Sequence, residues 1–410
     1  MTIHLYDPSP FRNEYFSVMF AKPMMAFQRI TKTSNLDSVK NSIVVVLTDH
    51  LSEDLIQKLK NNNCKIVGFN VTDSSYFSES IRHCKSLESI DLIFMVSGVP
   101  NVNTAKDFKI TPDFGIETFS YPFLPEHEWF VFDRMRKKQL KSLPYVPWTP
   151  IPDYPWTQYA HRSQKVLLRG GGHSRRFILG LFLMKHQLLD INSAMMLGFY
   201  FEDGMNPAFR FCDACRKDFR SNKQHYPYSP PIDSGPCNSP ARHGNTWSLE
   251  NLGYWNNRCP RSYYWMAEKF QKRYGPVNIG EVETLLNGKW IHDLDHQKML
   301  SRILFTSDLK WIHSIYAPQR FWQGANAGCV NLLPNRTAEQ DYFPEMKPDI
   351  HYLTFNEDMQ GLDLEAKITE REYVNISKSA RSIYDDYLRT TDYSIGTPIL
   401  KHIFDSIRAI

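Results

Sequence analysis

The stretch QKVLLRGGGHSRRFILGLFLMKHQLL, residues 164–189, decides the fold of the second half of the chain. An apolar run leads into three consecutive glycines, and a long apolar segment follows that suits a buried helix. A strand that ends in a glycine turn and continues into a helix is the first part of a parallel βαβ unit. We therefore predict a strand, a turn at Gly170, Gly171 and Gly172, and a helix that begins near Ser174.

The first 142 residues show the same alternation of apolar runs and amphipathic segments. Three runs predict buried parallel strands, namely NSIVVVLTDH (41–50), CKIVGFNVTD (64–73) and IDLIFMVSG (90–98). Between them, 51–63 and 78–89 have helical periodicity, and the first of these begins with a serine cap. Repetition at this spacing predicts a doubly wound parallel sheet.

A proline-rich connection divides the chain into two predicted α/β domains. The segment LPYVPWTPIPDYPW (143–156) has five prolines, which exclude a helix or an inner strand and favour a semi-rigid linker. We predict an N-terminal domain at 1–142 and a C-terminal domain at 157–385, interrupted by an insertion at 205–262 that is rich in Pro, Asn, Ser and Cys. Residues 386–410 are expected to pack back on the first domain.

Later segments continue the pattern. We predict a helix at 320–327, a strand at 329–334, a charged amphipathic helix at 368–389 and a last helix at 397–408. Two doubly wound domains joined by a rigid linker predict a cleft between them, with ligands at the carboxyl ends of the strands.

Composition narrows the class of protein. The 410 residues carry 48 Lys and Arg against 44 Asp and Glu, a balance that permits an anionic partner but is far from that of a dedicated nucleic-acid module. No apolar run is long enough for a transmembrane helix, and the start MTIHLYDPSP lacks the features of a secretory signal, so we expect a cytoplasmic protein. The seven cysteines argue against a disulfide framework.

The glycine turn and the residues after it suggest an anion site. Backbone N–H groups at a helix start favour anions, and Arg175 and Arg176 add positive charge where a purely structural helix would carry Asp or Glu. A diphosphate is the simplest ligand of this kind. The alternative is a glycine-rich turn followed by solvated arginines.

Two further places carry candidate site residues. Arg320 and Gln323 lie one helical turn apart in PQRFWQGANAG and could hold a phosphate and ribose hydroxyls, or belong to an ordinary helix packed on a sheet. Asp73 ends a predicted strand and could be a general base or a helix cap. Asp49 and His50 end the preceding strand and are weaker candidates of the same kind.

These segments resemble those of a known family. The layout is similar to GT-B glycosyltransferases, and KIVGFNVTD, VLLRGGGHSRR and QRFWQ resemble, in order, motifs of phage β-glucosyltransferases that act on hydroxymethylcytosine in DNA and of related spore-type enzymes. The resemblance implies that Asp73 is the base, that Arg175 and Arg176 contact the donor diphosphate, and that Arg320 binds phosphate. Gln323 stands where the family has a Glu on the ribose, which leaves the identity of the nucleotide sugar open.

The insertion carries four cysteines that could hold a structural zinc ion. Cys212 and Cys215 form a CxxC pair, whereas Cys237 and Cys259 are isolated, so the spacing supports either a closed zinc site or no metal. Basic and aromatic residues alternate in the same region. This pattern suits contacts with DNA and equally an ordinary loop anchored by aromatic side chains.

The leading hypothesis is a glycosyltransferase that takes a sugar from a nucleotide-diphosphate donor, most simply a UDP-sugar. The resemblance implies that the first domain binds the acceptor, a hydroxymethylated base in double-stranded phage DNA. Two alternatives remain: a glycan or small-molecule acceptor, and a non-catalytic nucleic-acid-binding protein on the same scaffold. No membrane partner is expected.

Overall fold

The computed structural model describes the framework of both halves of the chain. The described residues are 1–8, 16–28, 30–71, 85–96, 139–144, 146, 151, 153–171, 174–196, 267–268, 270–286, 298–307, 319–334, 342–355, 368–389 and 395–410.

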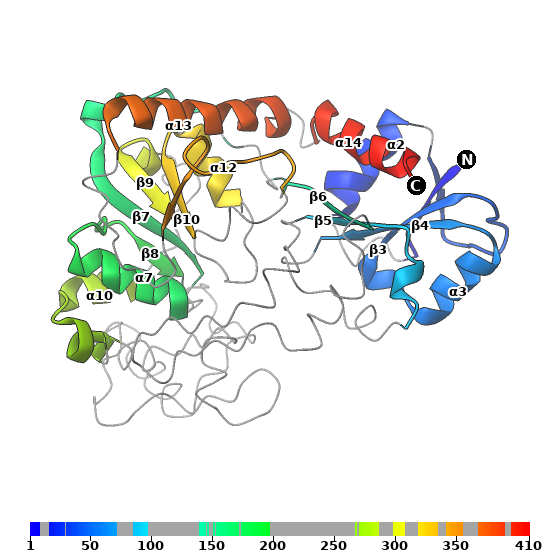
Figure 1. The fold of residues 1–410 in the computed structure, drawn as a ribbon, viewed down its shortest axis with the longest axis horizontal. Helices are drawn as coiled ribbons and strands as arrows, with labels where there is room; N and C mark the ends of the chain where they lie inside the picture. The colour runs from blue at the N-terminus through cyan, green and yellow to red at the C-terminus, as the bar shows by residue number, and fades with distance from the viewer. Residues whose placement is uncertain are drawn as a thin grey trace, which may run out of the picture.

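The first sheet is built from the N-terminal part of the chain (Figure 1). Among the described residues it has six strands in the order β2-β1-β3-β4-β5-β6, and all neighbours are parallel. Because β1 lies between β2 and β3, the chain winds outward in both directions from β1, as in a doubly wound sheet. The strands are β1 (Ile3–Tyr6), β2 (Thr31–Thr33), β3 (Ile43–Leu47), β4 (Lys65–Asn70), β5 (Leu92–Met95) and β6 (Leu140–Ser142).

The β3 strand and the helix after it show why the sequence folds this way. All five residues of β3 are buried, as expected for an inner strand with both faces covered. Helix α3 (Glu53–Asn61) begins at Ser52, whose hydroxyl oxygen accepts a hydrogen bond from the backbone N–H of Leu55 at 3.3 Å. The predicted strand and the capped helix are both confirmed.

The second sheet is built from the C-terminal part of the chain. Within the described residues its order is β11-β10-β9-β7-β8, again with every neighbouring pair parallel. The first of these strands in the chain, β7, therefore lies between the second, β8, and the third, β9. This is the flavodoxin-like order. The strands are β7 (Ser163–Gly171), β8 (Ala194–Met196), β9 (Ile303–Ser307), β10 (Val330–Pro334) and β11 (Leu353–Phe355).

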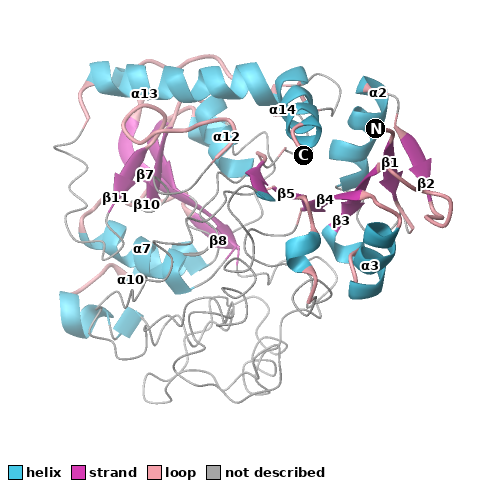
Figure 2. Cartoon of the chain, turned by 45° about the vertical axis from the view of Figure 1, so that its right-hand side comes forward, coloured by secondary structure: helices cyan, strands magenta, loops and turns pink. Residues whose placement is uncertain are grey.

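Helices cover both faces of the second sheet (Figures 1 and 2). Helix α7 (Ser174–Lys185) and helix α10 (Ile279–Leu286) lie together on one side, and α12 (Gln319–Asn326) lies on the other with α13 (Glu370–Ile383). The contact between α7 and α10 is close, because a Cβ atom at Gly180 would lie 2.6 Å from Leu285 Cδ2.

The C-terminal segment connects the two sheets. After α13 the chain continues through a π-helical turn, η10 (Tyr384–Leu388), to α14 (Thr397–Arg408), which lies against the first sheet beside the N-terminal helix α2 (Lys22–Phe27). Ile399, Ile403 and Ile407 of α14 are fully buried in the same apolar cluster as residues of β3, β4 and β5. Phe404 also stacks on Phe27, with ring centroids 5.6 Å apart.

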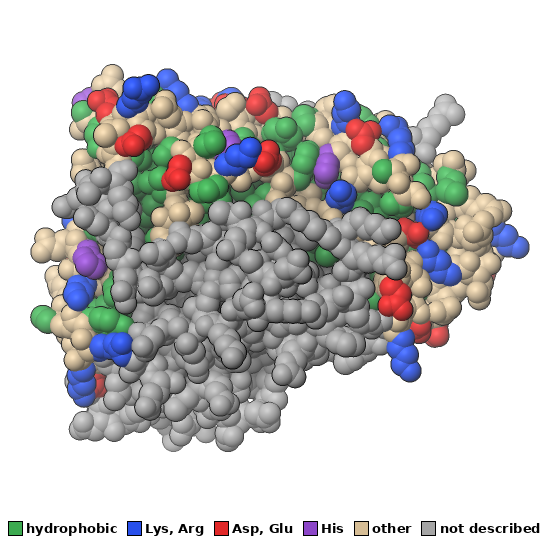
Figure 3. Space-filling view, viewed as in Figure 1, with side chains coloured by type: hydrophobic (Ala, Val, Ile, Leu, Met, Phe, Trp, Pro, Cys, Tyr) green, Lys and Arg blue, Asp and Glu red, His purple; other side chains and the backbone are tan. Residues whose placement is uncertain are grey.

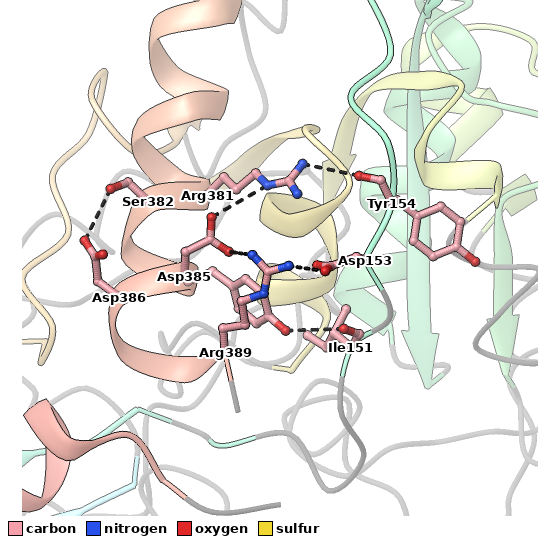
Figure 4. A network of polar contacts seen from close by, with 9 residues as sticks. Ile151, Asp153, Tyr154, Arg381, Ser382, Asp385, Asp386 and Arg389 are labelled. Carbon is pink, nitrogen blue, oxygen red and sulfur yellow. Dashed lines mark hydrogen bonds and ion pairs between the residues drawn. The ribbon is translucent and has the colours of Figure 1, made fainter. Parts of the chain in front are cut away.

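Polar contacts hold the linker to the end of α13 (Figure 4). Arg389 pairs with Asp153 of the linker and with Asp385 of η10, the latter at 3.2 Å. Arg381 donates a hydrogen bond to the carbonyl oxygen of Tyr154 at 3.3 Å. The Arg389 and Asp153 side chains are 42% and 58% exposed, so their pair contributes little free energy and chiefly sets the path of the linker.

A buried arginine joins the amino ends of the second sheet's strands. Arg162, 6% exposed, directly precedes β7. Its Nη1 donates to the carbonyl oxygens of Leu300 (3.1 Å) and Ile303 (2.8 Å), its Nη2 to that of Ala327 (2.6 Å) and its Nε to that of Thr157 (3.1 Å). Nη1 also donates to Cys329 Sγ at 3.9 Å. These acceptors are backbone carbonyls and a core thiol, so the role of Arg162 is structural.

The structure confirms the predicted fold class, two doubly wound α/β sheets of the Rossmann-like kind. The predicted helices at 320–327, 368–389 and 397–408 are present. The insertion at 205–262 and most of the predicted helix at 78–89 lie outside the described residues. No described helix has the length and apolar character needed to cross a bilayer.

Replacing Arg162 by Met tests the structural role of the guanidinium. Met has a similar apolar stem but no donor, so three buried carbonyl oxygens and the half-buried one of Thr157 lose a partner. We expect the free energy of unfolding, measured by urea titration, to fall by about 3 kcal/mol or more. The matched change of the exposed Arg371 to Met should alter it by less than about 0.5 kcal/mol. Equal effects of the two changes would contradict this role.

Candidate functional site

The second sheet has its topological switch point between β7 and β9. The chain leaves β7 toward β8 on one side and returns to β9 on the other, and ligands of such sheets bind outside the carboxyl ends of the strands at this point. Here β7 ends at Gly171 and β9 ends at Ser307, with Leu168 and Ser307 in register. The predicted turn is therefore wrong for Gly170 and Gly171, which pair with Met195 and Met196 of β8 and so belong to the end of β7. Helix α7 begins at Ser174, as predicted. Gly172 lies outside the described residues.

A buried guanidinium organises this edge of the sheet. Arg169, 2% exposed, lies on β7 immediately before the glycines. Its Nε donates to Thr306 Oγ1 on β9 (3.2 Å), its Nη1 to Gln323 Oε1 (3.2 Å) and its Nη2 to the carbonyl oxygen of Arg320 (2.7 Å). One side chain thus fixes the start of α12 to the ends of β7 and β9.

Helix α12 also packs directly on the sheet. Asn331 of β10 donates from Nδ2 to the carbonyl oxygen of Phe321 at 3.2 Å. At Gly324 a Cβ atom would lie 2.8 Å from both Asn331 Oδ1 and Thr306 Cγ2, which is closer than such atoms approach. The small residues after Gln323 therefore allow the close contact that the sequence predicts.

The arginines predicted to contact a diphosphate lie around this edge. Arg320 is partly exposed on the first turn of α12, next to the Arg169 contact. Arg176 lies in the first turn of α7 and is 1% exposed, so its guanidinium is inside the domain. Arg175 occupies the same turn, and its side chain lies outside the described part of the structure. The structure brings both segments to one edge, while their contact with phosphate stays a prediction.

The carboxyl edge of the first sheet carries a second polar group. Thr48 and Asn70, which follow β3 and end β4, are fully buried, and Thr48 Oγ1 donates to Asn70 Oδ1 at 3.4 Å. Asp49 and His50 lie beside them in a short 3-10 helix, η2 (Thr48–His50). Burial raises the pKa of the Asp49 carboxyl above its usual value, and the nearby His50 opposes this in part. The predicted base, Asp73, lies outside the described residues.

The predicted zinc ligands Cys212, Cys215, Cys237 and Cys259 also lie outside the described residues. Within the described ranges no group of three or more His, Cys, Asp or Glu side chains is arranged to hold a metal ion. Cys64 and Cys329 are free and buried, as expected for apolar core positions.

Arg169 is the functional candidate that the sequence pattern does not reveal. It follows the apolar residues of VLLRG, and a lone arginine at such a place indicates the exposed end of a strand. The sequence does carry one signal of this role, because a charged residue inside an inner parallel strand needs buried hydrogen-bond partners. The identity of those partners, 137 to 154 residues away in the sequence, follows only from the fold.

A Gly324→Ala change tests how closely α12 must seat on the sheet. The added methyl group meets Thr306 and Asn331, so we expect a loss of about 1–3 kcal/mol in the free energy of unfolding and weaker binding of any ligand at this edge. Gly280→Ala in α10 is the control. There the nearest atom is Asn278 Oδ1 at 3.3 Å, and stability should stay within about 1 kcal/mol. Unchanged unfolding of the Gly324→Ala variant would show that α12 is not seated as described.

Comparison with known proteins finds distant structural similarity only. No model of a protein family matches the sequence, and no curated protein does. Among solved structures, HepE of Anabaena in complex with UDP and glucose has a TM-score of 0.38 at 9% identity, with all of both chains covered. The same protein with UDP gives 0.38 at 8% identity. A Listeria monocytogenes protein described as a UDP-N-acetylglucosamine 2-epimerase gives 0.31 at 10% identity, covering 100% of this chain and 95% of the other.

Proposed function

We propose that the chain binds a nucleotide-diphosphate sugar at the carboxyl ends of β7 and β9 and transfers the sugar to an acceptor hydroxyl. The observation that carries the proposal is the buried Arg169 guanidinium, which ties the glycine-rich end of β7 to the start of α12 at the switch point of a parallel sheet. This edge gathers positive charge and helix starts, which together suit an anionic ligand.

The chemistry of this edge supports a diphosphate leaving group. Departure of a nucleoside diphosphate builds negative charge on phosphate oxygens, and preorganised donors stabilise that charge. Arg320 can supply a charge-assisted bond from α12, and the first turn of α7 supplies backbone N–H groups next to Arg175 and Arg176. A UDP-sugar is the donor that the sequence resemblance favours.

An acceptor hydroxyl needs a general base, and two carboxylates are candidates. Asp73 is the residue that the resemblance favours, and it follows β4 by three positions. Asp49 follows β3, the neighbouring strand, and its raised pKa brings a carboxylate closer to the range in which a base works efficiently.

The acceptor proposed from the sequence is a hydroxymethylated base in DNA. On the face shown in Figure 3, the charged side chains of the described residues are of both signs and interspersed. The described part of this face therefore offers no continuous basic surface for DNA. A glycan or small-molecule acceptor is the second candidate, because the mixed charge of this face suits a neutral acceptor equally well.

Binding of UDP, measured by calorimetry, tests the donor site. We expect wild-type protein to bind UDP and the Arg320→Ala variant to bind it more weakly by about 1.5–3 kcal/mol, because a charge-assisted bond is lost. Arg371→Ala, an exposed arginine on α13, should leave affinity unchanged. A wild-type protein that binds neither UDP nor another nucleoside diphosphate would refute the proposed function.

Asparagine variants at the two carboxylates identify the base. Turnover with a panel of UDP-sugars and hydroxymethylated DNA should fall about 10²–10⁴-fold in the variant of the true base, with UDP affinity unchanged. If Asp49 is the base, the wild-type rate should rise with pH through its elevated pKa and level off above it, because only the ionised form accepts a proton. Two variants that both keep more than about half the wild-type rate would exclude both residues.

The thermal stability of the Asp49→Asn variant distinguishes a catalytic role of Asp49 from a structural one. Because burial raises its pKa in the folded state, ionisation of Asp49 opposes folding as the pH rises through that pKa. Asp49→Asn should therefore unfold at the same or a higher temperature than wild type at neutral pH, and its relative advantage should shrink in acid. A variant that is less stable at neutral pH would show that the ionised carboxylate supports the fold.

A further inference from the structure

The hydrogen bond between Arg169 and Gln323 fixes which way the Gln323 amide points. A guanidinium has only donors, so the atom of Gln323 that faces it must be the oxygen, here 3.2 Å from Arg169 Nη1. Gln323 is 5% exposed and its side chain makes no other hydrogen bond with the described residues. Its amide N–H₂ group is therefore left as a donor beside a buried positive charge.

Gln323 therefore offers a hydrogen-bond donor at the place where the sequence resemblance implies an acceptor. A Glu at this position would accept hydrogen bonds from ribose hydroxyls, and it would also pair with Arg169 and cancel its charge. With Gln, the side chain binds Arg169 without bringing a negative charge of its own, and the bond to Oε1 polarises the amide so that the N–H₂ group donates more strongly. A ribose hydroxyl can accept from this group, but an anionic phosphate oxygen is the stronger acceptor.

We infer that Gln323 is a specificity-determining residue that donates to an anionic phosphate oxygen of the nucleotide diphosphate, held in that orientation by Arg169. This inference rests on the proposed nucleotide site and adds which ligand group lies at Gln323. Arg320, whose carbonyl oxygen binds the same guanidinium, provides the positive charge next to it on α12. The ligand class is therefore selected by its phosphates at this point of the site.

The two roles of residue 323 predict opposite effects of Gln323→Glu. If Gln323 donates to phosphate, the new carboxylate repels it and neutralises Arg169, so affinity for UDP should fall about ten-fold or more while affinity for uridine stays the same. If residue 323 holds the ribose, Glu restores the better acceptor, and both UDP and uridine should bind equally well or more tightly. Calorimetric titration of each ligand into each variant measures the difference.

Controls keep the outcomes separate. Lys401→Gln, at an exposed position of α14, changes the net charge by the same amount and should leave both affinities unchanged. Gln323→Met removes the donor without adding charge, and it should weaken the binding of UDP but not that of uridine. This variant takes the place of the Glu variant if circular dichroism shows that the Glu variant does not fold. If wild type binds UDP and either folded variant binds UDP as tightly as wild type, the inference is overturned and the proposed function stands. If wild type does not bind UDP, the proposed function itself fails.

Discussion

The guanidinium of Arg169 is the interaction on which the arrangement of the proposed site depends. It joins β7, β9 and α12, three elements that are distant in sequence, through a hydroxyl, an amide oxygen and a backbone carbonyl. A buried charge is costly unless its hydrogen bonds are satisfied, so these elements are held in one relative position. The glycine-rich end of β7, Arg320 and Gln323 are positioned by that constraint.

A second buried arginine, with a different role, lies just before the same strand. Arg162 directly precedes β7, donates to backbone carbonyls and lies against the Tyr373 ring, with its Cζ atom 5.5 Å from the centroid. Tyr373 in turn donates to the carbonyl oxygen of Gly328 at 2.8 Å, and burial raises its pKa to about 12. Arg162 and Tyr373 thus support the amino ends of the strands, whereas the candidate site lies at the carboxyl ends, as is usual in parallel sheets.

Much of the fold follows from the sequence, because inner parallel strands are continuous apolar runs and their helices begin with recognisable caps. The strands β3, β4, β5 and β7 contain such runs, and Ser52 and Thr369 cap α3 and α13. Helix α14 has no side-chain cap and begins with a proline in its first turn. Strand β1 (Ile3–Tyr6) is short and mostly only half-buried, and β9 (Ile303–Ser307) follows a segment with helical spacing, so neither has a clear signal of its own. For the site, the pattern points to the glycine-rich segment and to Arg320 and Gln323, whose binding of a ligand stays a prediction; the structure places Gly170 and Gly171 at the end of β7. The pattern misses Arg169 and hence the orientation of Gln323, since both depend on contacts made across more than 130 residues.

The central claim, that a nucleoside diphosphate binds at the carboxyl ends of β7 and β9, is tested most directly by amide hydrogen exchange with and without UDP. Because bound phosphate would occupy the backbone N–H groups of the glycine turn and restrain the start of α12, residues 168–176 and 319–324 should exchange more slowly when UDP is present. The amino-end contacts around Arg162 should be unaffected, because they lie at the opposite ends of the strands. Protection by UDP confined to segments outside these two would contradict the account.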